Sequence, residues 1–400
     1  MKILVLNAGS STQKSCLYDI TGDIPFSPPA PLWEGKVDWS HHQGVAEIQV
    51  ETATGEKFTE KIATDSQSQV MARLLNTISE GSTKVINQSE IDVVGHRVVH
   101  GGKNYRESVV ITPEVKNAIA NLATLAPAHN PVNLAGIEAV EELLGVTQVA
   151  VFDTAFHRNM PDAAAIYPGP YNWVEQDIIR YGFHGISHQY CAERAAEILG
   201  KDLQSLRLIN CHLGNGCSLA AIKNGCSIDT TMGFTPLDGL MMGSRSGSVD
   251  PGILIYLLQQ KDCTVEQLYN VLNKASGLNG ISGISSDMRQ IKAAISQGNE
   301  RAQLALDIYI HRLRSYIGAM LASLGGLDAL VFTAGVGENS PEIRQAACQP
   351  FEFLGVKIDS SKNISKPIDK DIATTDSAVR VLVIHTQEDW QIARECYKFV

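Results

Sequence analysis

Two stretches of the chain share one pattern: a strand, a tight turn rich in small residues, and a second strand. The first is ILVLNAGSSTQKSCLYDI at 3–20, and the second is LRLINCHLGNGCSLAAI at 206–222. They lie roughly 200 residues apart, about half of the chain, and a repeat over such a distance indicates two copies of one fold. Each copy is expected to begin with a β-hairpin whose turn is the size of a phosphate group.

The turn of the second hairpin, at 212–216, contains two glycines. Without side chains, backbone N–H groups can crowd against an anion. Farther along, Arg245 stands between Gly243 and Gly247 in a glycine-rich stretch. A phosphate-sized turn followed by an arginine on a loop indicates phosphoryl chemistry. The hairpin by itself also suits two surface turns of an ordinary sheet.

Length and composition limit the classes of protein to consider. Four hundred residues exceed one ordinary core and predict two domains. A net charge of −10 argues against a nucleic-acid partner or an anionic membrane. The eight cysteines have no zinc-site spacing and read as reduced core residues, while no apolar stretch approaches the ~18 residues of a membrane helix. We therefore expect a cytoplasmic protein without a membrane span.

Strands alternate with helices along the rest of the chain, which predicts a mixed-sheet α/β fold. Buried strands are expected near 91–94, 149–152, 329–332 and 381–384. Helices are expected at 66–79, 113–125, 131–144, 265–272, 288–295 and 301–324. The glycine-rich stretch 333–341 is expected to be a turn that faces the N-terminus of a helix starting at Ser340-Pro341.

Functional residues of such folds gather where strands end. This rule selects Asn7, Thr12, Arg97, Asp153, His212–Gly216, Arg245, Gly335–Asn339 and Glu388. The chain has no GxxxxGK[ST] motif and no protein-kinase signature, and its glycine pairs lack the third glycine of a dinucleotide fingerprint.

Several long motifs resemble those of the acetate kinase family, within the superfamily of acetate and sugar kinases, actin and heat-shock-chaperone ATPases. They are LVLNAGSS (4–11), GHRVVHGG (95–102), LAPAHNP (125–131), VFDTAFH (151–157), GFHGISH (182–188), HLGNG (212–216), MGFTPLDGLMMGSRSG (232–247) and GVGEN (335–339). The resemblance covers nearly the whole chain. It implies two duplicated ribonuclease-H-like domains, with mixed sheets flanked by helices, that close over a central cleft.

The expected domains are 1–153 plus 386–400 on the carboxylate side and 154–385 on the nucleotide side. The resemblance also implies a homodimer. Such an enzyme makes acetyl phosphate and ADP from acetate and ATP, reversibly, with Mg²⁺ or Mn²⁺, by direct in-line transfer.

The resemblance implies catalytic roles for Asp153, Arg97, His184 and Arg245, with Arg97 near the substrate and Arg245 on the phosphoryl group in flight. Arginine's planar fork suits carboxylate and phosphate. A lone histidine near glycines, as His184 is, is otherwise most often a structural hydrogen-bonding group. Because acetate is ionised at neutral pH, no general base is required. Magnesium positioning is therefore the favoured role of Asp153, with proton transfer second.

The remaining implied roles cover substrate, metal and nucleotide. Substrate contacts are Arg97, Val99, His129, Phe183 and Pro236, and metal ligands are Asn7 and Glu388. Nucleotide contacts are Lys14, His212, Leu213, Gly214, Asn215, Gly216, Asp287, Met288, Arg289, Gly335, Val336, Gly337, Glu338 and Asn339. Lys14 also reads as an outward strand lysine, and Glu388 as a first-turn acid that stabilises its helix.

Two alternatives stay open. Ala128 stands where the family usually has leucine beside the substrate histidine, so the acyl pocket could be wider and admit propionate. An ATP-driven scaffold of the actin or chaperone kind would need the nucleotide turns but no acyl-facing cations. The presence of Arg97, Arg245 and His184 disfavours it.

Overall fold

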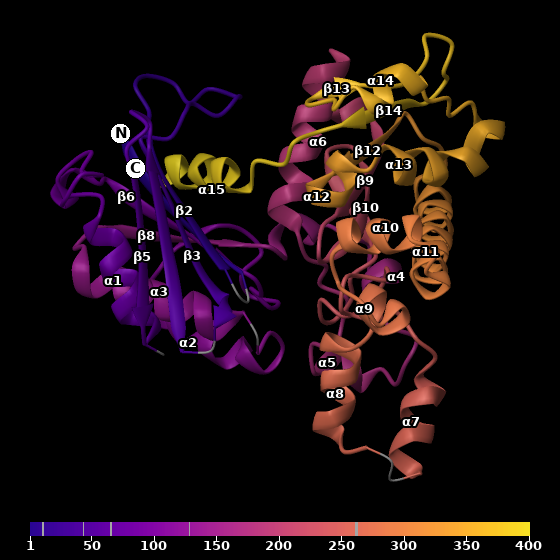
Figure 1. The fold of residues 1–400 in the computed structure, drawn as a ribbon, viewed down its shortest axis with the longest axis horizontal. Helices are drawn as coiled ribbons and strands as arrows, with labels where there is room; N and C mark the ends of the chain where they lie inside the picture. Colours follow the sequence, from indigo (N-terminus) through magenta and orange to yellow (C-terminus); the bar gives the residue numbers. More distant parts are fainter. Residues whose placement is uncertain (10–11, 43, 65, 128, 261–262) are drawn as a thin grey trace. The chain divides into compact units, whose positions relative to one another are not determined.

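The computed structural model describes residues 1–9, 12–42, 44–64, 66–127, 129–260 and 263–400. The chain divides into two compact units (Figure 1). Unit 1 comprises Met1–Ala155 and Gln387–Val400, and unit 2 comprises Phe156–Thr386. Among the described residues, no helix has the length and apolar character that crossing a membrane requires.

Unit 1 is built on a mixed sheet that has eight strands in the described part of the chain, in the order β5-β4-β3-β2-β1-β6-β8-β7. The strands are β1 Lys2–Ala8, β2 Thr12–Asp19, β3 Trp33–His42, β4 Val45–Thr52, β5 Lys57–Ala63, β6 Val93–Val98, β7 Val109–Val110 and β8 Thr147–Phe152. The helices are α1 Gln67–Asn76, α2 Pro113–Asn121, α3 Asn130–Leu143 and α15 Glu388–Cys396. β1, β6 and β8 run parallel, whereas β1 to β5 form an antiparallel meander.

Helices cover both faces of this sheet because successive strand residues point to opposite sides. Val94 packs with Val140 of α3 in the larger apolar core of the unit. Its neighbour Gly95 faces the other side, where a Cβ atom would meet Ile392 of α15 at 2.7 Å. The absence of a side chain at Gly95 therefore lets α15 approach β6 closely, and α15 carries Glu388 in its first turn.

Unit 2 has a mixed sheet with six strands among the described residues, in the order β11-β10-β9-β12-β14-β13. The strands are β9 Arg207–Leu213, β10 Cys217–Lys223, β11 Cys226–Thr230, β12 Ala329–Thr333, β13 Lys370–Asp371 and β14 Arg380–Val383. The helices are α4 Asp162–Ala165, α5 Asn172–Glu175, α6 Gly185–Leu199, α7 Pro251–Gln259, α8 Val265–Lys274, α9 Gly277–Ser282, α10 Met288–Ser296, α11 Glu300–Leu324, α12 Ala334–Asn339, α13 Pro341–Cys348 and α14 Ser360–Ile364.

The two sheets repeat one topology. In each unit the first strand pairs with the second in antiparallel fashion and with a later strand in parallel fashion, and a third parallel strand follows. The match extends to an edge strand of two residues, β7 or β13, which precedes the last parallel strand in sequence and pairs with it antiparallel. The predicted duplicated mixed α/β fold is thereby confirmed.

The sequence determines where several helices begin and end. Thr112 caps α2 by accepting a hydrogen bond from the Val115 N–H group, and proline occupies the first turn. Asn299 caps the 25-residue helix α11, and Gly325 ends it in the left-handed conformation (φ +67°). α6 and α11 lie on opposite faces of the sheet: Asn210 of β9 bonds to α6, and Cys217 of β10 contacts Tyr309 of α11.

Candidate active site

Three neighbouring parallel strands of unit 1 end at a cluster of polar side chains. Asn7 lies near the end of β1, Arg97 near the end of β6, and Asp153 directly follows β8. Arg97 donates from Nη2 (2.6 Å) and Nε (3.1 Å) to Asp153 Oδ2. Its Nη1 donates to Asn7 Oδ1 at 3.2 Å. The guanidinium group of Arg97 thus links side chains from both adjacent strands.

A residue that the sequence analysis did not select, Asp389, completes this cluster. Asn7 Nδ2 donates to Asp389 Oδ1 at 2.6 Å, so the two ends of the Asn7 amide are held by Asp389 and Arg97. Burial is the main cause that raises the pKa of Asp389, and the negative charge of Glu388 adds to it. The hydrogen bond from Asn7 acts in the opposite direction. The orientation of Asn7 is therefore fixed by partners of opposite chemistry.

Charge pairing keeps Arg97 protonated. Burial alone would lower its pKa, but the carboxylates of Asp153 and Glu388 more than offset burial, so the pKa lies above its usual range. Arg97 is only 15% exposed in its side chain and Asp153 1%. A buried cation already paired with one carboxylate thus lies at the strand ends, where ligands of such folds usually bind.

The other selected residues of unit 1 surround the same strand ends. Val99 is buried, and its N–H group donates to Asn133 Oδ1 at 3.2 Å. His129 is half-buried at the N-cap of α3. Lys14 is exposed on β2, directly across from Asn7 in the strand register. Ala128, on which the expected width of the acyl pocket depends, lies outside the described residues.

In unit 2 two selected histidines stack on each other. His184 is the N-cap of α6 and has a left-handed backbone (φ +56°). Its ring lies over that of His212, with centroids 4.2 Å apart and planes inclined by 20°. Its Nδ1 is 2.9 Å from Ser218 Oγ, and His212 Nδ1 is 2.8 Å from Ser187 Oγ. Each ring is therefore held by a serine hydroxyl on one edge and by its neighbour on one face.

Arg245 and His184 both approach Gly216 in the turn of the second hairpin. A Cβ atom at Gly216 would lie 2.6 Å from Arg245 Nη2 and 3.3 Å from His184 Nε2. Burial lowers the pKa of Arg245, yet an arginine side chain keeps its charge at neutral pH. Arg245 Nη1 donates to the Pro236 carbonyl oxygen at 2.6 Å. The side chains of Arg245 and His184 thus both approach the space that a side chain at Gly216 would occupy.

The two apolar candidates of unit 2 lie beside these groups. Phe183 is buried, and its carbonyl oxygen is 3.0 Å from His157 Nε2. Pro236 is partly buried and serves Arg245 as the carbonyl partner described above. Phe183 directly precedes His184 in the chain, and Pro236 bonds to Arg245, so each adjoins one of the two groups.

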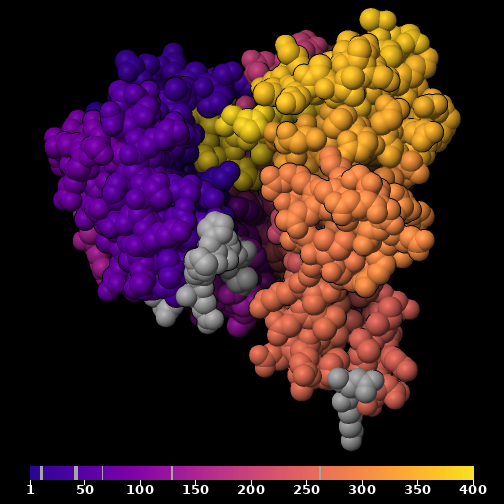
Figure 2. All heavy atoms as spheres, in the orientation of Figure 1, coloured from indigo at the N-terminus to yellow at the C-terminus, as the bar shows by residue number. Residues whose placement is uncertain are grey.

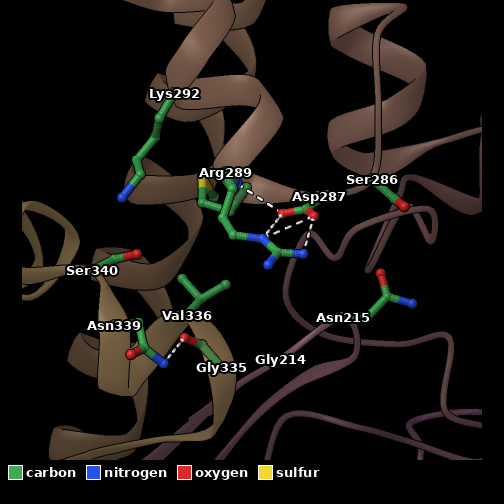
Figure 3. Close-up of a pocket in the computed structure, with 11 residues that line it drawn as sticks. Gly214, Asn215, Ser286, Asp287, Arg289, Lys292, Gly335, Val336, Asn339 and Ser340 are labelled. Atoms are coloured by element: carbon green, nitrogen blue, oxygen red, sulfur yellow. Dashed lines mark hydrogen bonds and ion pairs between the residues drawn. The ribbon is translucent and has the colours of Figure 1, made fainter.

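A cavity of about 730 Å³ lies beside the same hairpin turn (Figure 3). It is lined by Gly214, Asn215, Ser286, Asp287, Met288, Arg289, Lys292, Gly335, Val336, Asn339 and Ser340. Eight of these residues were expected to bind nucleotide. The size falls within the range of sites for small molecules and cofactors.

The cations of this cavity are each paired with an acid. Arg289 bonds to both Asp287 oxygens, and this contact is the main cause that lowers the pKa of Asp287. Asp287 also caps α10 by accepting from the Arg289 N–H group at 2.8 Å. Lys292 Nζ donates to Glu342 at 2.7 Å. The side chain of Arg289 is 88% exposed and can thus meet an incoming anion.

Several expected nucleotide contacts do not line the cavity. Five of them are close in sequence to lining residues but do not line the cavity themselves: His212, Leu213, Gly216, Gly337 and Glu338. The sixth, Lys14, is part of unit 1. The Glu338 carboxylate instead accepts from the Thr386 N–H group at 3.3 Å and lies 2.6 Å from His385 Nδ1.

One expectation about local structure is wrong. The glycine-rich stretch after β12 is not a turn facing a helix N-terminus, because Ala334–Asn339 form the short helix α12. Buried Arg344 of α13 stabilises this helix by donating to the carbonyl oxygens of Gly337 and Glu338, both at 2.8 Å. Asn339 Nδ2 also donates to the Gly335 carbonyl oxygen at 3.0 Å (Figure 3). Satisfied carbonyl groups outweigh the poor helix propensity of glycine here.

Functional residues of two kinds were not predicted from the sequence. Three residues that line the cavity follow no pattern that would mark them: Ser286 and Ser340, which adjoin selected motifs, and Lys292, three residues beyond Arg289. His188 and Ser218 hold His184, and here a signal was present: His188 follows His184 by four residues, so both lie on one face of α6.

Sequence comparison identifies the family. Residues 2–394 match the Acetokinase family. The chain belongs to the acetokinase family. It is 72% identical to the acetate kinase of Nostoc punctiforme, with 100% of both chains covered, and 70% identical to that of Trichormus variabilis, with 99% of each covered.

Solved structures agree with this family assignment. A crystal structure of Porphyromonas gingivalis acetate kinase is similar with a TM-score of 0.89 at 42% identity, covering 99% of each chain. A propionate kinase from Francisella tularensis has a TM-score of 0.90 at 37% identity, covering 100% of both chains. The fold is therefore shared by kinases named for either acid.

Proposed function

We propose that the chain catalyses the reversible, Mg²⁺-dependent transfer of the ATP γ-phosphoryl group to acetate, giving acetyl phosphate and ADP by direct in-line displacement. Membership of the acetokinase family makes it a phosphotransferase that uses a carboxyl group as acceptor. The observation that carries the proposed chemistry is the approach of Arg245 Nη2 and His184 Nε2 to Gly216, beside the cavity lined by Gly214 and Asn215.

Unit 1 supplies the groups proposed to bind the acceptor. Arg97 is a charged, largely buried guanidinium at a strand end, and it binds the acetate carboxylate. Val99 is the proposed contact of unit 1 with the methyl group, and His129 its proposed contact with the carboxylate. Phe183 and Pro236 are the apolar substrate contacts proposed for unit 2. Because acetate is ionised at neutral pH, Asp153 orients Arg97 and the metal rather than removing a proton.

Unit 2 supplies the groups proposed to bind nucleotide and stabilise the transferred phosphoryl group. The cavity residues from Asp287 to Arg289 and from Gly335 to Asn339 hold the nucleotide. His184 and Arg245 donate hydrogen bonds to phosphoryl oxygens. A cation at this position compensates the charge that builds up as two anions react. Lys14 of unit 1 remains a proposed phosphate contact.

The family implies a divalent metal, and the residues present fit Mg²⁺. Asn7, Asp153 and Glu388 offer oxygen donors, the ligands that Mg²⁺ prefers, and Mg²⁺ usually keeps several waters and few protein ligands. Within the described residues, no three His, Cys, Asp or Glu side chains form a metal site of their own. When bound, the metal would neutralise charge on the substrate phosphates. Mn²⁺ has the same ligand preference.

The hydroxylamine trap tests the reaction. Acyl hydroxamate should form only when ATP, Mg²⁺ and acetate are all present. Hydrolysis of ATP without hydroxamate would instead support an actin- or chaperone-like ATPase scaffold. The ratio of kcat/KM for acetate and propionate, measured in the same assay, decides between the two acids. Acetate is the proposed preference because the most similar relatives named above are acetate kinases.

The proposed assembly is a homodimer formed through α7. This nine-residue helix, PGILIYLLQ, has no charged residue and no buried residue. Ile253, Ile255 and Tyr256 are 49%, 56% and 60% exposed. Figure 2 shows α7 and α8 at the protruding lower end of unit 2. An uncharged apolar helix face is complementary to a second copy of itself across a twofold axis.

The proposed location is the cytoplasm. All eight cysteines are free, and most of them are buried. Free thiols in this number are typical of a reducing compartment.

A further inference from the structure

Four histidines of unit 2 form one continuous cluster behind the hairpin turn. The ring of His157 lies 5.7 Å from that of His188, His188 lies 6.2 Å from His212, and His212 lies 4.2 Å from His184. Only His184 directs a nitrogen toward Gly216 and Arg245 among the atoms nearest to that glycine. His188 is therefore connected to this position through His184.

One serine hydroxyl connects two of these rings. Ser218 Oγ is 2.9 Å from His184 Nδ1 and 2.8 Å from His188 Nε2. Ser218 is fully buried on β10, directly across from His212 in the strand register. A hydroxyl group has one proton to donate and two lone pairs that accept. If both neutral rings donated to Ser218, its own buried proton would lack an acceptor, because the described residues offer Ser218 Oγ no partner besides these two rings. One histidine therefore donates to Ser218 and the other accepts from it.

The surroundings of His188 decide the direction. His188 is fully buried, and burial, followed by its neighbours His157 and His212, lowers its pKa well below the usual value, so the ring is neutral. Its Nδ1 is buried and has no hydrogen-bond partner in the part of the chain that the structure describes. A proton on Nδ1 would be a buried donor without an acceptor, which is costly and rare. The proton therefore belongs on Nε2, which donates to Ser218.

The position of the proton on His184 follows. Since Ser218 accepts from His188, its own proton is donated to His184 Nδ1. We propose that His188, acting through Ser218, holds His184 in the tautomer that carries its proton on Nε2, so that this N–H group faces the phosphoryl site beside Arg245. The opposite tautomer would present a lone pair to a phosphoryl oxygen and repel it.

His188 and Ser218 are thus positioning residues, and their role rests on the phosphoryl-binding role of His184 proposed above. The same hydroxyl fixes the rotation of the His184 ring, whose face is already held by His212. The groups that face His184 include His212 from β9, Ser218 from β10, His188 from the helix that His184 caps, and Arg245 from the loop beyond β11.

Nuclear magnetic resonance tests the tautomer without reference to activity. Long-range ¹H–¹⁵N correlation of the full chain labelled with ¹⁵N-histidine distinguishes protonated from bare ring nitrogens, and His184→Gln identifies the signals of His184. We expect His184 to carry its proton on Nε2 and His188 also on Nε2. Protonation of His184 on Nδ1, or a rapid mixture of both forms, would overturn the proposal even if the kinase reaction is confirmed.

Kinetics test the consequence. Ser218→Ala should lower kcat by at least about tenfold, because both ring orientation and proton position are lost, with KM for ATP and acetate within about twofold. Ser218→Thr retains the hydroxyl group and should keep most of the activity. Ser227→Ala is the matched control: Ser227 is also buried and bonds to a histidine of the cluster, His157, at 2.7 Å, and none of its bonds to the described residues is to His184 or His188.

The control separates positioning from folding. If Ser218→Ala and Ser227→Ala lower kcat equally, or if Ser218→Ala raises KM alone, the hydroxyl has only a structural role and the proposal is wrong. Absence of hydroxamate with the unmodified chain would contradict the proposed function instead, while the tautomer measurement would still stand.

Discussion

Asn7 of β1 and His212 of β9 occupy equivalent positions in the two units. In each hairpin this residue lies one position before the cross-strand pair that is nearest to the turn. Asn7 is opposite Lys14, and His212 is opposite Ser218. Both lie where a parallel strand ends, so one duplicated position supplies an amide in unit 1 and an imidazole in unit 2. The repeat thus provides two similar frames whose side chains have diverged in chemistry.

The same divergence applies to the cations. In unit 1 the cation Arg97 is on β6 itself and is held by Asp153 and Asn7. In unit 2 the cation Arg245 lies on a loop after β11 and bonds to a backbone carbonyl group. Because no carboxylate of the described residues bonds to Arg245, its charge is available to a phosphoryl group.

Arg245→Ala should lower kcat on the order of 10³-fold with little change in KM for ATP, because the lost charge acts on the transferred group and not on the bound nucleotide. Steady-state rates at saturating acetate measure this. Arg245→Lys retains the charge but not the planar fork, so its kcat should lie between that of the unmodified chain and that of Arg245→Ala. A loss smaller than tenfold in Arg245→Ala would contradict the proposed role.

Strand ends and hairpins were predictable from the sequence because apolar runs stop abruptly at small and polar residues. Asn7, Arg97 and Asp153 each follow or end such a run, and the structure brings them within hydrogen-bonding distance. The chain's half-length repeat likewise predicted the duplicated sheet topology that is found.

What remained hidden depends on contacts between distant segments. Asp389 reads as an ordinary first-turn acid, and only the packing of α15 on β6 places it against Asn7, more than 380 positions away in sequence. Helix α12 contradicts the local propensity of its two glycines because Arg344, from the next helix, satisfies its carbonyl groups. Such effects arise from tertiary structure, and single-segment patterns do not contain them.

Lys292→Ala should raise KM for ATP by about two- to fivefold, which corresponds to the ~0.5–1 kcal/mol of a partly exposed ion contact. Lys292 lines the cavity, and its ammonium group is available to phosphate at the expense of its bond with Glu342. Lys274→Ala is the control, since Lys274 is an exposed lysine that does not line the cavity. Equal KM values for ATP in both variants would show that Lys292 does not contribute to nucleotide binding.

Asp389→Asn should make the free energy of unfolding less dependent on pH. Burial raises the folded-state pKa of Asp389 above its unfolded value, so its favourable contribution is present at acid pH and is lost as the pH rises through the folded pKa. The variant should therefore gain stability relative to the unmodified chain as pH rises. Urea unfolding at a series of pH values measures the difference.

Asp359→Asn provides a control of opposite sign for that experiment. Hydrogen bonds from Ser361 and the Lys362 N–H group lower the pKa of Asp359, which caps α14. Its stabilising contribution appears above the unfolded pKa and is lost as pH falls. If both variants change in the same direction with pH, the environment assigned to Asp389 is wrong.

Gly95→Ala should destabilise the chain by about 1–3 kcal/mol, the usual cost of overpacking a core. The added Cβ would clash with Ile392 and Cys396 and push α15 away from β6. Because α15 carries Glu388 and Asp389, activity should fall as well. Gly145→Ala is the control, as nothing lies within 4 Å of a Cβ there. Unfolding midpoints and kcat are measured for both variants. Stability and activity should both fall in Gly95→Ala and stay unchanged in Gly145→Ala.

Ile255→Glu should convert the proposed dimer into monomers. Ile255 is 56% exposed at the middle of α7, and a buried carboxylate facing its twofold-related copy would be repelled and desolvated. Light scattering coupled to gel filtration measures the mass. Leu304→Glu on α11 is the matched control, because Leu304 is 52% exposed but lies on another helix. A dimer that persists in Ile255→Glu and dissociates in Leu304→Glu would move the interface from α7 to α11.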